Sequence, residues 1–479
     1  MAKKKKKTTK KATPSKASDA PTEDAVATEV IEEPVSEDPE APEAPETSDD
    51  SPEDAEDAED AEAVDVAEEV AEDPAPASKP APKVKAKTKD APKKKKDDKV
   101  DPFDAFVSAA KDRWPGSIEK ASDLPVDGTP TMSTGNFVLD RMTYGGLRRG
   151  RLYRFWGIPK SAKTGSALNC AEAFTNNHCG LCYEHRLFCK CEGDFVFAKC
   201  LYVDVEGRIA DNRPWAEAHG IDPTRIAMVS PKGGEQVVDI ADAALRSDAG
   251  IGLVIIDSIA QMTAVDEVTK AAEKGKTIGR NAMLVNSALR KWVCSIVSKD
   301  IASTCKPTVI LINQLRQKTS AFGNPDVMPG GLGQGYASAC DIKFTKRQKH
   351  YLMSDGKGGF NDKVVKFQGT WKPGEDDTAN FIEIETKITD SGICPPGRFG
   401  TFHYWMQAGH GRRVGDTDNT IWLWEYAKKY DLLKKQEKGQ GYTLLELEAR
   451  TQKGMEKRFL EDIDCQELVW IALMKILNK

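Results

Sequence analysis

A buried strand, a short polar loop and a helix follow one another directly between residues 151 and 174. Residues 151–156 (RLYRFW) read as the strand, residues 157–164 (GIPKSAKT) as the loop, and residues 166–174 (SALNCAEAF) as the helix. The loop fits the G-x-x-x-x-G-K-[ST] pattern, in which backbone N–H groups converge on phosphate, except that Ala162 replaces the second glycine. This succession predicts an α/β fold with a nucleotide site; a strand–turn–helix junction with a chance Lys-Thr pair is the alternative.

Each residue of this loop has a predicted part in binding phosphate. Lys163 would neutralise the terminal phosphates, and the Thr164 hydroxyl would ligate Mg²⁺. Ala162 can replace glycine only if its φ stays negative, because a Cβ disfavours the left-handed region. The predicted phosphate-binding residues are Gly157, Ile158, Pro159, Lys160, Ser161, Ala162, Lys163, Thr164 and Gly165.

Apolar runs alternate with helical segments after this loop, which indicates a mainly parallel sheet with helices on both faces. The predicted strands are 152–156, 197–205, 251–256 and 308–312. In such sheets ligands bind at the carboxyl ends of the strands. Glu206, Asp257 and Gln314 follow three of these strands, so they are predicted to lie beside the phosphate loop.

Residues 1–100 differ in composition from the rest of the chain. They contain 18 Lys, 28 Asp or Glu and no aromatic residue or Cys, so they carry a net charge of −10 and are predicted to be disordered. The remainder has a net charge of +4. No run approaches 18 apolar residues, and the Lys-rich start lacks the apolar segment of a secretory signal. We therefore expect neither a membrane-spanning nor a secreted protein.

Three long segments resemble the RecA family of strand-exchange recombinases, in particular its bacteriophage members of the UvsX type. They are residues 132–157 (MSTGNFVLDRMTYGGLRRGRLYRFWG), 234–263 (GEQVVDIADAALRSDAGIGLVIIDSIAQMT) and 312–331 (INQLRQKTSAFGNPDVMPGG). Phage proteins of this type also carry a residue other than glycine before the loop Lys, as at Ala162 here. The resemblance implies a RecA-type P-loop core that binds ATP and Mg²⁺ between neighbouring subunits.

The resemblance also implies the roles of the residues at the strand ends. By this likeness Lys163 and Thr164 contact the phosphates and Mg²⁺, and Asp257 is the Walker-B acid that holds Mg²⁺. Glu206 is the catalytic carboxylate, and Gln314 is the switch between the ATP site and a DNA-binding loop.

Two lysines lie where the family has basic residues that reach the ATP of a neighbouring subunit. These are Lys349 and, second in preference, Lys346; an exposed charge cluster at a strand end is the alternative. The resemblance further implies a helical homo-oligomeric filament on single-stranded DNA and exchange with homologous duplex DNA in the cytoplasm of a bacterium or a phage-infected host. Single-strand-binding and mediator proteins are candidate partners.

Two loops are expected to touch DNA. The first, 267–280, is basic and contains two glycines, and the second, 316–335, is rich in glycine. Such loops suit contacts to the phosphate backbone without base preference, although ordinary surface loops are the alternative. The predicted DNA-binding residues are Lys270, Lys274, Lys276, Arg280, Arg290, Arg316, Lys318, Phe322, Gly330 and Gly331.

A cysteine-rich insertion, 176–200, separates the helix after the phosphate loop from the next strand. Cys179, Cys182, Cys189 and Cys191 lie close enough in sequence to surround one tetrahedral Zn²⁺. A neighbouring His178, His185 or Cys200 could replace one ligand, and reduced thiols without metal, with a redox switch as a minor option, are the alternative. The chain has eleven Cys, six of them crowded between Cys170 and Cys200, which does not resemble a secreted disulfide framework, so a reducing compartment is expected.

The predicted organisation has four parts: the disordered tail 1–100, an N-terminal helix and linker for subunit contact at 101–131, the RecA-like ATPase core at 132–407, and a small α-rich C-terminal domain at 408–479. The predicted function is that of an ATP-dependent DNA recombinase. A helicase-type motor with the same core, or a paralogue that regulates recombination without ATP turnover, are the alternatives.

Overall fold

The computed structural model describes residues 101–124, 130–265, 279–299, 303, 305–317, 326, 327, 329, 333–354, 360–365, 379–436 and 441–477. The tail 1–100, predicted to be disordered, lies outside these residues.

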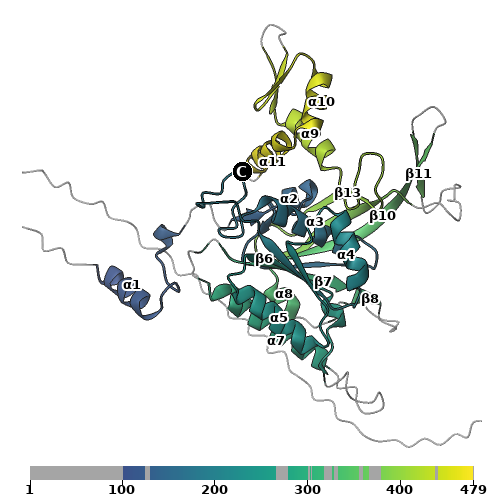
Figure 1. The fold of residues 1–479 in the computed structure, drawn as a ribbon. Coiled ribbons are helices and arrows are strands. Elements are labelled where there is room, and N and C mark those ends of the chain that lie inside the picture. The colour runs from purple at the N-terminus through teal and green to yellow at the C-terminus, as the bar shows by residue number, and fades with distance from the viewer. Residues whose placement is uncertain are drawn as a thin grey trace, which may run out of the picture. The chain divides into compact units, whose positions relative to one another are not determined.

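A nine-stranded sheet forms the centre of the described structure (Figure 1). Its strand order is β13-β12-β10-β3-β7-β6-β4-β5, and β11 pairs with β10. The strands are β3 (Leu152–Gly157), β4 (Lys199–Asp204), β5 (Ile226–Val229), β6 (Ile251–Asp257), β7 (Thr308–Gln314), β10 (Cys340–Ser354), β11 (Phe360–Val365), β12 (Phe381–Ser391) and β13 (Phe399–Trp405). Neighbours from β10 to β5 run parallel, which confirms the predicted α/β class with a mainly parallel sheet. The antiparallel strands β11, β12 and β13 were not foreseen in the sequence.

Helices cover both faces of this sheet (Figure 1). They are α2 (Phe137–Met142), α3 (Lys163–Asn177) and α4 (Ile209–Ala218) on one face, and α5 (Gly234–Arg246), α7 (Arg280–Val297) and α8 (Gly333–Ala337) on the other. Shorter or peripheral elements are α1 (Pro102–Arg113), the 3₁₀ turns Ala121–Asp123 and Ile259–Gln261, and the two-stranded pairs β1 (Thr131–Met132) with β2 (Leu147–Arg148) and β8 (Arg316–Gln317) with β9 (Asp326–Val327).

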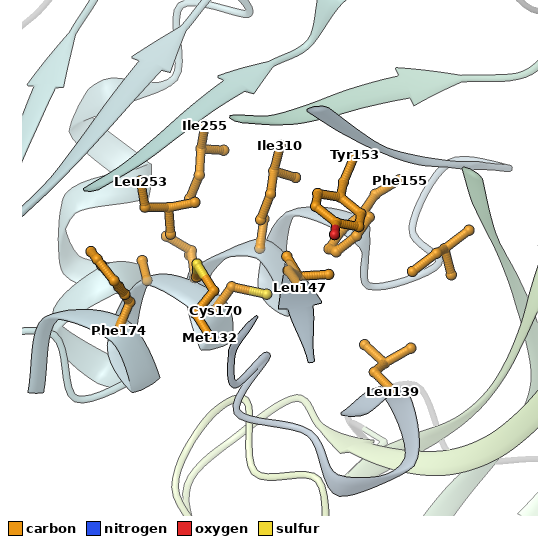
Figure 2. Packing of buried hydrophobic residues seen from close by; sticks show 14 of the residues in the cluster. Met132, Leu139, Leu147, Tyr153, Phe155, Cys170, Phe174, Leu253, Ile255 and Ile310 are labelled. Carbon is orange, nitrogen blue, oxygen red and sulfur yellow. The ribbon is translucent and has the colours of Figure 1, made fainter. Parts of the chain in front are cut away.

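Alternate residues of the central strands enter two separate apolar clusters. In β6, Leu253 and Ile255 join the cluster that contains Phe174 of α3, whereas Val254 and Ile256 join the cluster under α5 and α7. Successive strand side chains point to opposite faces, so a strand buried on both faces reads as one continuous apolar run. Figure 2 shows the first cluster, where Cys170 of α3 lies fully buried among these side chains and contributes to the core.

The C-terminal region has its own small core. Helices α9 (Asn419–Lys429), α10 (Gln452–Glu461) and α11 (Ile463–Leu477) surround it, together with the strands β14 (Leu433–Lys435), β15 (Tyr442–Leu444) and β16 (Leu447–Ala449). The three-stranded sheet was missed in the sequence, because each of its strands is only three residues long. Phe137 of α2 belongs to the same apolar cluster, and Trp470 of α11 donates a hydrogen bond to Asp140 (3.1 Å), so α11 packs on α2.

Candidate nucleotide site and its neighbours

The phosphate loop joins the end of β3 to the start of α3. Gly157 has φ +150°, and a Cβ there would lie 2.2 Å from the carbonyl oxygen of Phe344, so only glycine fits. Gly165, in the first turn of α3, lies against Tyr404, whose hydroxyl would be 1.8 Å from an added Cβ. Both glycines therefore let other parts of the chain approach the loop closely.

Ala162 has the left-handed backbone conformation that glycine adopts most easily. Its φ is +61°, so the expectation that alanine serves here only with a negative φ is wrong. A left-handed conformation costs a residue with a Cβ about 1–2 kcal/mol. The hydrogen bond from Ser166 N to Ala162 O (2.8 Å) starts α3 in spite of that cost.

The Lys163 side chain is buried and folded over its own loop. Its ammonium donates hydrogen bonds to the carbonyl oxygens of Ile158 (2.7 Å) and Gly157 (3.2 Å). Burial lowers the pKa of Lys163 to about 8, although the negative charges of Asp257 and Glu206 oppose that decrease. A positive charge at a helix N-terminus beside free N–H groups suits a polyphosphate.

Thr164 and Asp257 meet in the structure, as their predicted shared role with Mg²⁺ requires. Thr164 Oγ1 donates to Asp257 Oδ2 (2.8 Å), and the Tyr202 hydroxyl donates to the same oxygen (2.7 Å). Burial raises the pKa of Asp257, and the hydrogen bonds from Tyr202 and Thr164 act against that rise. Carboxylate and hydroxyl oxygens fit a hard cation such as Mg²⁺. Tyr202, held by Asn212 (3.3 Å), was not singled out in the sequence, where it reads as one more apolar strand residue.

Glu206 follows β4, and hydrogen-bond donors surround its carboxylate. Its Oε1 accepts from Ser258 Oγ (3.0 Å) and from the amide of Gln314, while Oε2 pairs with Arg208. The main-chain N–H of Glu206 also donates to Asp257 O (3.3 Å), so β4, β6 and β7 meet at this point. The structure thus brings Glu206 and Gln314 into contact. The Arg208 pair was missed, because nothing in the sequence shows where a loop arginine will point.

A hydrogen-bonded path leads from this point to the end of the second loop. Asn313, beside Gln314, donates to Gln334 Oε1 (2.8 Å) and to Pro329 O (3.1 Å). Gln334 in turn donates to Pro329 O (2.6 Å). The strand that carries Gln314 therefore also holds the C-terminal end of the loop 316–335.

A buried ion pair between β3 and β10 also contacts Gln334. Arg154 and Asp341 are cross-strand partners on β3 and β10, and Arg154 Nε donates to Asp341 Oδ1 (3.1 Å). Arg154 also reaches Gln334 Oε1 (3.5 Å). The charge of Arg154 in the middle of the apolar strand Leu152–Gly157 was the available signal for this pair.

The structure describes only some of the residues that are predicted to contact DNA. Arg290 is exposed on α7, and Arg280 begins that helix and is partly exposed. Arg316 lies in β8, where only the backbone is described. Lys270, Lys274, Lys276, Lys318, Phe322, Gly330 and Gly331 lie outside the described residues.

Lys346 and Lys349 lie on β10, next to the strand that ends in the phosphate loop. Burial lowers the pKa of Lys346, and the nearby charges of Lys349 and Lys160 lower it further. Because Lys160 belongs to the phosphate loop, the three ammonium groups form one positively charged region that an anion would stabilise.

The four cysteines of the insertion form one cluster. All four Sγ atoms lie within 4.8 Å of one another, with Cys179–Cys191 at 3.9 Å and Cys182–Cys189 at 3.6 Å. A tetrahedral Zn²⁺ with Zn–S bonds of about 2.3 Å places its sulfurs about 3.8 Å apart, so the cluster fits that ion. Within the described ranges no histidine belongs to this group, and Cys200 lies apart from it, buried in β4.

Comparisons with known proteins agree with this architecture. The RecA N-terminal domain profile matches residues 105–368. Protein RecA of Borreliella burgdorferi (strain ZS7) is 28% identical over 310 residues, which are 64% of this chain and 71% of that protein. Protein RecA of Clostridioides difficile (strain 630) is 27% identical over 363 residues, 75% of this chain and 86% of that protein. Because this match covers more than half of the chain, the chain belongs to the RecA family.

Proposed function

We propose that this chain is a RecA-type recombinase that couples ATP hydrolysis to binding of single-stranded DNA, homologous pairing and strand exchange. The relatives named RecA, at about 28% identity over much of the chain, support a RecA-type recombinase function. The observation that carries the coupling is the contact between Glu206 and Gln314, with Asn313 beside them bound to the base of the second loop. One strand end thus touches both the proposed hydrolytic carboxylate and the proposed DNA loop.

The residues of the site divide the work of ATP hydrolysis. Lys163 neutralises the terminal phosphates, and Thr164 and Asp257 hold Mg²⁺, which supplies charge neutralisation when bound. Glu206 orients the attacking water and accepts its proton. Ser258 and Arg208 fix the direction of the Glu206 carboxylate through their contacts with it.

Gln314 transmits the state of the ATP site to DNA. Its amide can donate a hydrogen bond either to Glu206 or to a phosphate oxygen. Gln314 takes a different position in each case, and this difference changes the positions of Asn313 and the second loop. Lys346 and Lys349 would approach the ATP of the next subunit in a filament. Backbone contacts through the two loops would give steep salt dependence and little base preference.

The finer placement within the family remains a prediction. Ala162 in place of glycine supports the bacteriophage type, and the cytoplasm is the expected site of action. No helix among the described residues is long and apolar enough to cross a membrane.

We further propose that Cys179, Cys182, Cys189 and Cys191 bind one structural Zn²⁺. The distances between their sulfur atoms support a closed four-thiolate site. Metal analysis of purified full-length chain should find about one Zn per chain, and none in a Cys182→Ser, Cys189→Ser variant. A fully folded wild-type chain without metal would contradict the site.

The ATPase rate with and without single-stranded DNA tests the main proposal. A recombinase is stimulated by single-stranded DNA and pairs it with a homologous duplex. A regulator without turnover shows no rate in either condition, and a helicase-type motor unwinds a forked duplex with one polarity. Either of the last two outcomes would overturn the proposal.

A further inference from the structure

We propose that the cysteine insertion is a metal-held clasp that fixes the first turns of α11 against the end of α3. This inference builds on the zinc site proposed above and gives that site a task. The clasp consists of residues 178–198, which lie between the last turn of α3 and the first residue of β4.

One side of the clasp is fixed to the core. Arg149, whose side chain is almost fully buried, pairs with Glu184 (2.7 Å) and donates to Cys182 O (3.2 Å). Cys305 Sγ donates to Leu181 O (3.3 Å). These contacts hold the segment from Leu181 to Glu184 to the core.

The other side of the clasp holds α11. Arg186 donates to Asp464 Oδ1 (2.8 Å) and to Glu467 Oε2 (2.8 Å), so one guanidinium bridges the first two turns of the helix. His185 Nε2 lies 3.9 Å from Glu467, and Lys475 lies 6.0 Å from the ring centre of Phe188. Each of these insertion residues stands between Cys182 and Cys189.

Direct packing between α3 and α11 is incomplete beside these contacts. A cavity of about 310 Å³ lies between the two helices, bordered by Asn169 and Glu172 of α3 and by Glu467 and Trp470 of α11. Because side chains do not fill this space, the insertion supplies much of the link between α3 and α11 here, while α11 also packs in the C-terminal core and on α2.

A bound metal would stabilise the conformation of the clasp. Within residues 178–198 the described secondary structure consists of turns and two isolated bridges, His178–His185 and Cys179–Phe197, so short turns rather than a helix or a strand define the loop. Arg186 lies in the segment that Cys182 and Cys189 close. Four thiolates on one ion would fix that segment, since structural zinc sites supply folding free energy to regions with little core.

The clasp also has a connection to the nucleotide site. Helix α3 begins with Lys163 at the phosphate loop and ends at Asn177, beside the insertion. Fifteen helical residues span about 22 Å. The metal-held loop therefore adds a link between the C-terminal region and the far end of the helix that begins at Lys163.

Hydrogen exchange measured by mass spectrometry on the full chain tests the clasp. Arg186→Ala should keep about one Zn per chain and raise exchange in peptides covering α11 by 3- to 10-fold, because the thiolates remain while the bridge is lost. Arg186→Lys should restore part of the protection. Arg246→Ala removes a comparably exposed ion pair on α5, with Asp242, and should leave α11 exchange unchanged.

The outcomes separate the clasp from the proposals it rests on. Unchanged α11 exchange in Arg186→Ala would overturn the clasp, whatever the metal content. Absence of zinc from the wild-type chain, with α11 protected all the same, would overturn the role of the metal. Neither readout uses ATP or DNA, so failure of the recombinase proposal would leave both results standing.

Discussion

The two ends of α3 serve two regions that are built in different ways. At its N-terminal end, the nucleotide site collects side chains from β3, β4, β6 and β7, which are far apart in sequence and mostly buried. At its C-terminal end, the insertion uses cysteines within thirteen residues and ion pairs that are partly exposed. The first region depends on the register of the sheet, and the second depends on local spacing and, in our proposal, on a bound metal.

This difference implies different responses to substitution. In the proposed function, residues of the nucleotide site act on phosphate and water, so their loss should abolish turnover while the fold, built on the two apolar clusters, persists. Residues of the insertion contact α11 and, through Tyr183, the apolar cluster around Phe174 near the C-terminal end of α3, so their loss should loosen structure while turnover persists. The following experiments can break or sharpen this contrast.

Lys163→Ala should have the largest effect on ATP turnover. Removing the charge that neutralises developing negative charge on phosphate should lower the rate on the order of 10³-fold. Steady-state phosphate release in the presence of single-stranded DNA measures this effect. Lys232→Ala, an exposed lysine in the loop before α5, is the matched control and should keep the wild-type rate.

Glu206→Gln should lower turnover about 100-fold and leave binding intact. The amide cannot accept a proton from water, but it has nearly the same size, and its single oxygen can still accept from Ser258 although the ion pair with Arg208 is lost. ATP-dependent binding to single-stranded DNA, measured by fluorescence anisotropy, should therefore persist. Loss of DNA binding together with turnover would contradict the assigned role.

The affinity for ATP should fall as pH rises above about 8. The pKa of Lys163 is lowered to about 8, so the charged form that binds phosphate is depleted above that pH in the free protein. The apparent Kd should rise by at most tenfold per pH unit in this range. Titration with a non-hydrolysable ATP analogue between pH 7 and 9.5 measures it. Lys163→Arg stays charged, so a similar inflection in that variant would assign the effect to another group.

Arg186→Ala should have the smallest effect on turnover. Its contacts lie in the insertion and on α11, so the ATPase rate should stay within twofold of wild type. The midpoint of thermal unfolding should fall by roughly 2 °C, which corresponds to a partly exposed ion pair worth under about 1 kcal/mol. A tenfold loss of ATPase activity would show that the two ends of α3 are not separable.

The phosphate loop and the strand ends beside it could be predicted from the sequence. Spacing alone located the phosphate loop and the strand ends at Glu206, Asp257 and Gln314, because parallel strands bring their carboxyl ends to one edge. The cysteine spacing likewise indicated a cluster, and the sulfur positions fit it.

The parts that depend on strand register were not predictable. Arg154 meets Asp341 only because β10 lies beside β3 in one particular alignment, and no single segment of sequence contains that information. The backbone at Ala162 was misjudged for a related reason. The surrounding loop and helix impose φ +61° on a residue whose own preference is for negative φ.

Electron microscopy of the full chain with single-stranded DNA tests the central claim most directly. With a non-hydrolysable ATP analogue the account expects continuous helical filaments on the DNA, and without nucleotide it expects few or none. Wild-type chain that coats DNA equally with and without nucleotide, or remains as single subunits in both conditions, would contradict a nucleotide-driven recombinase.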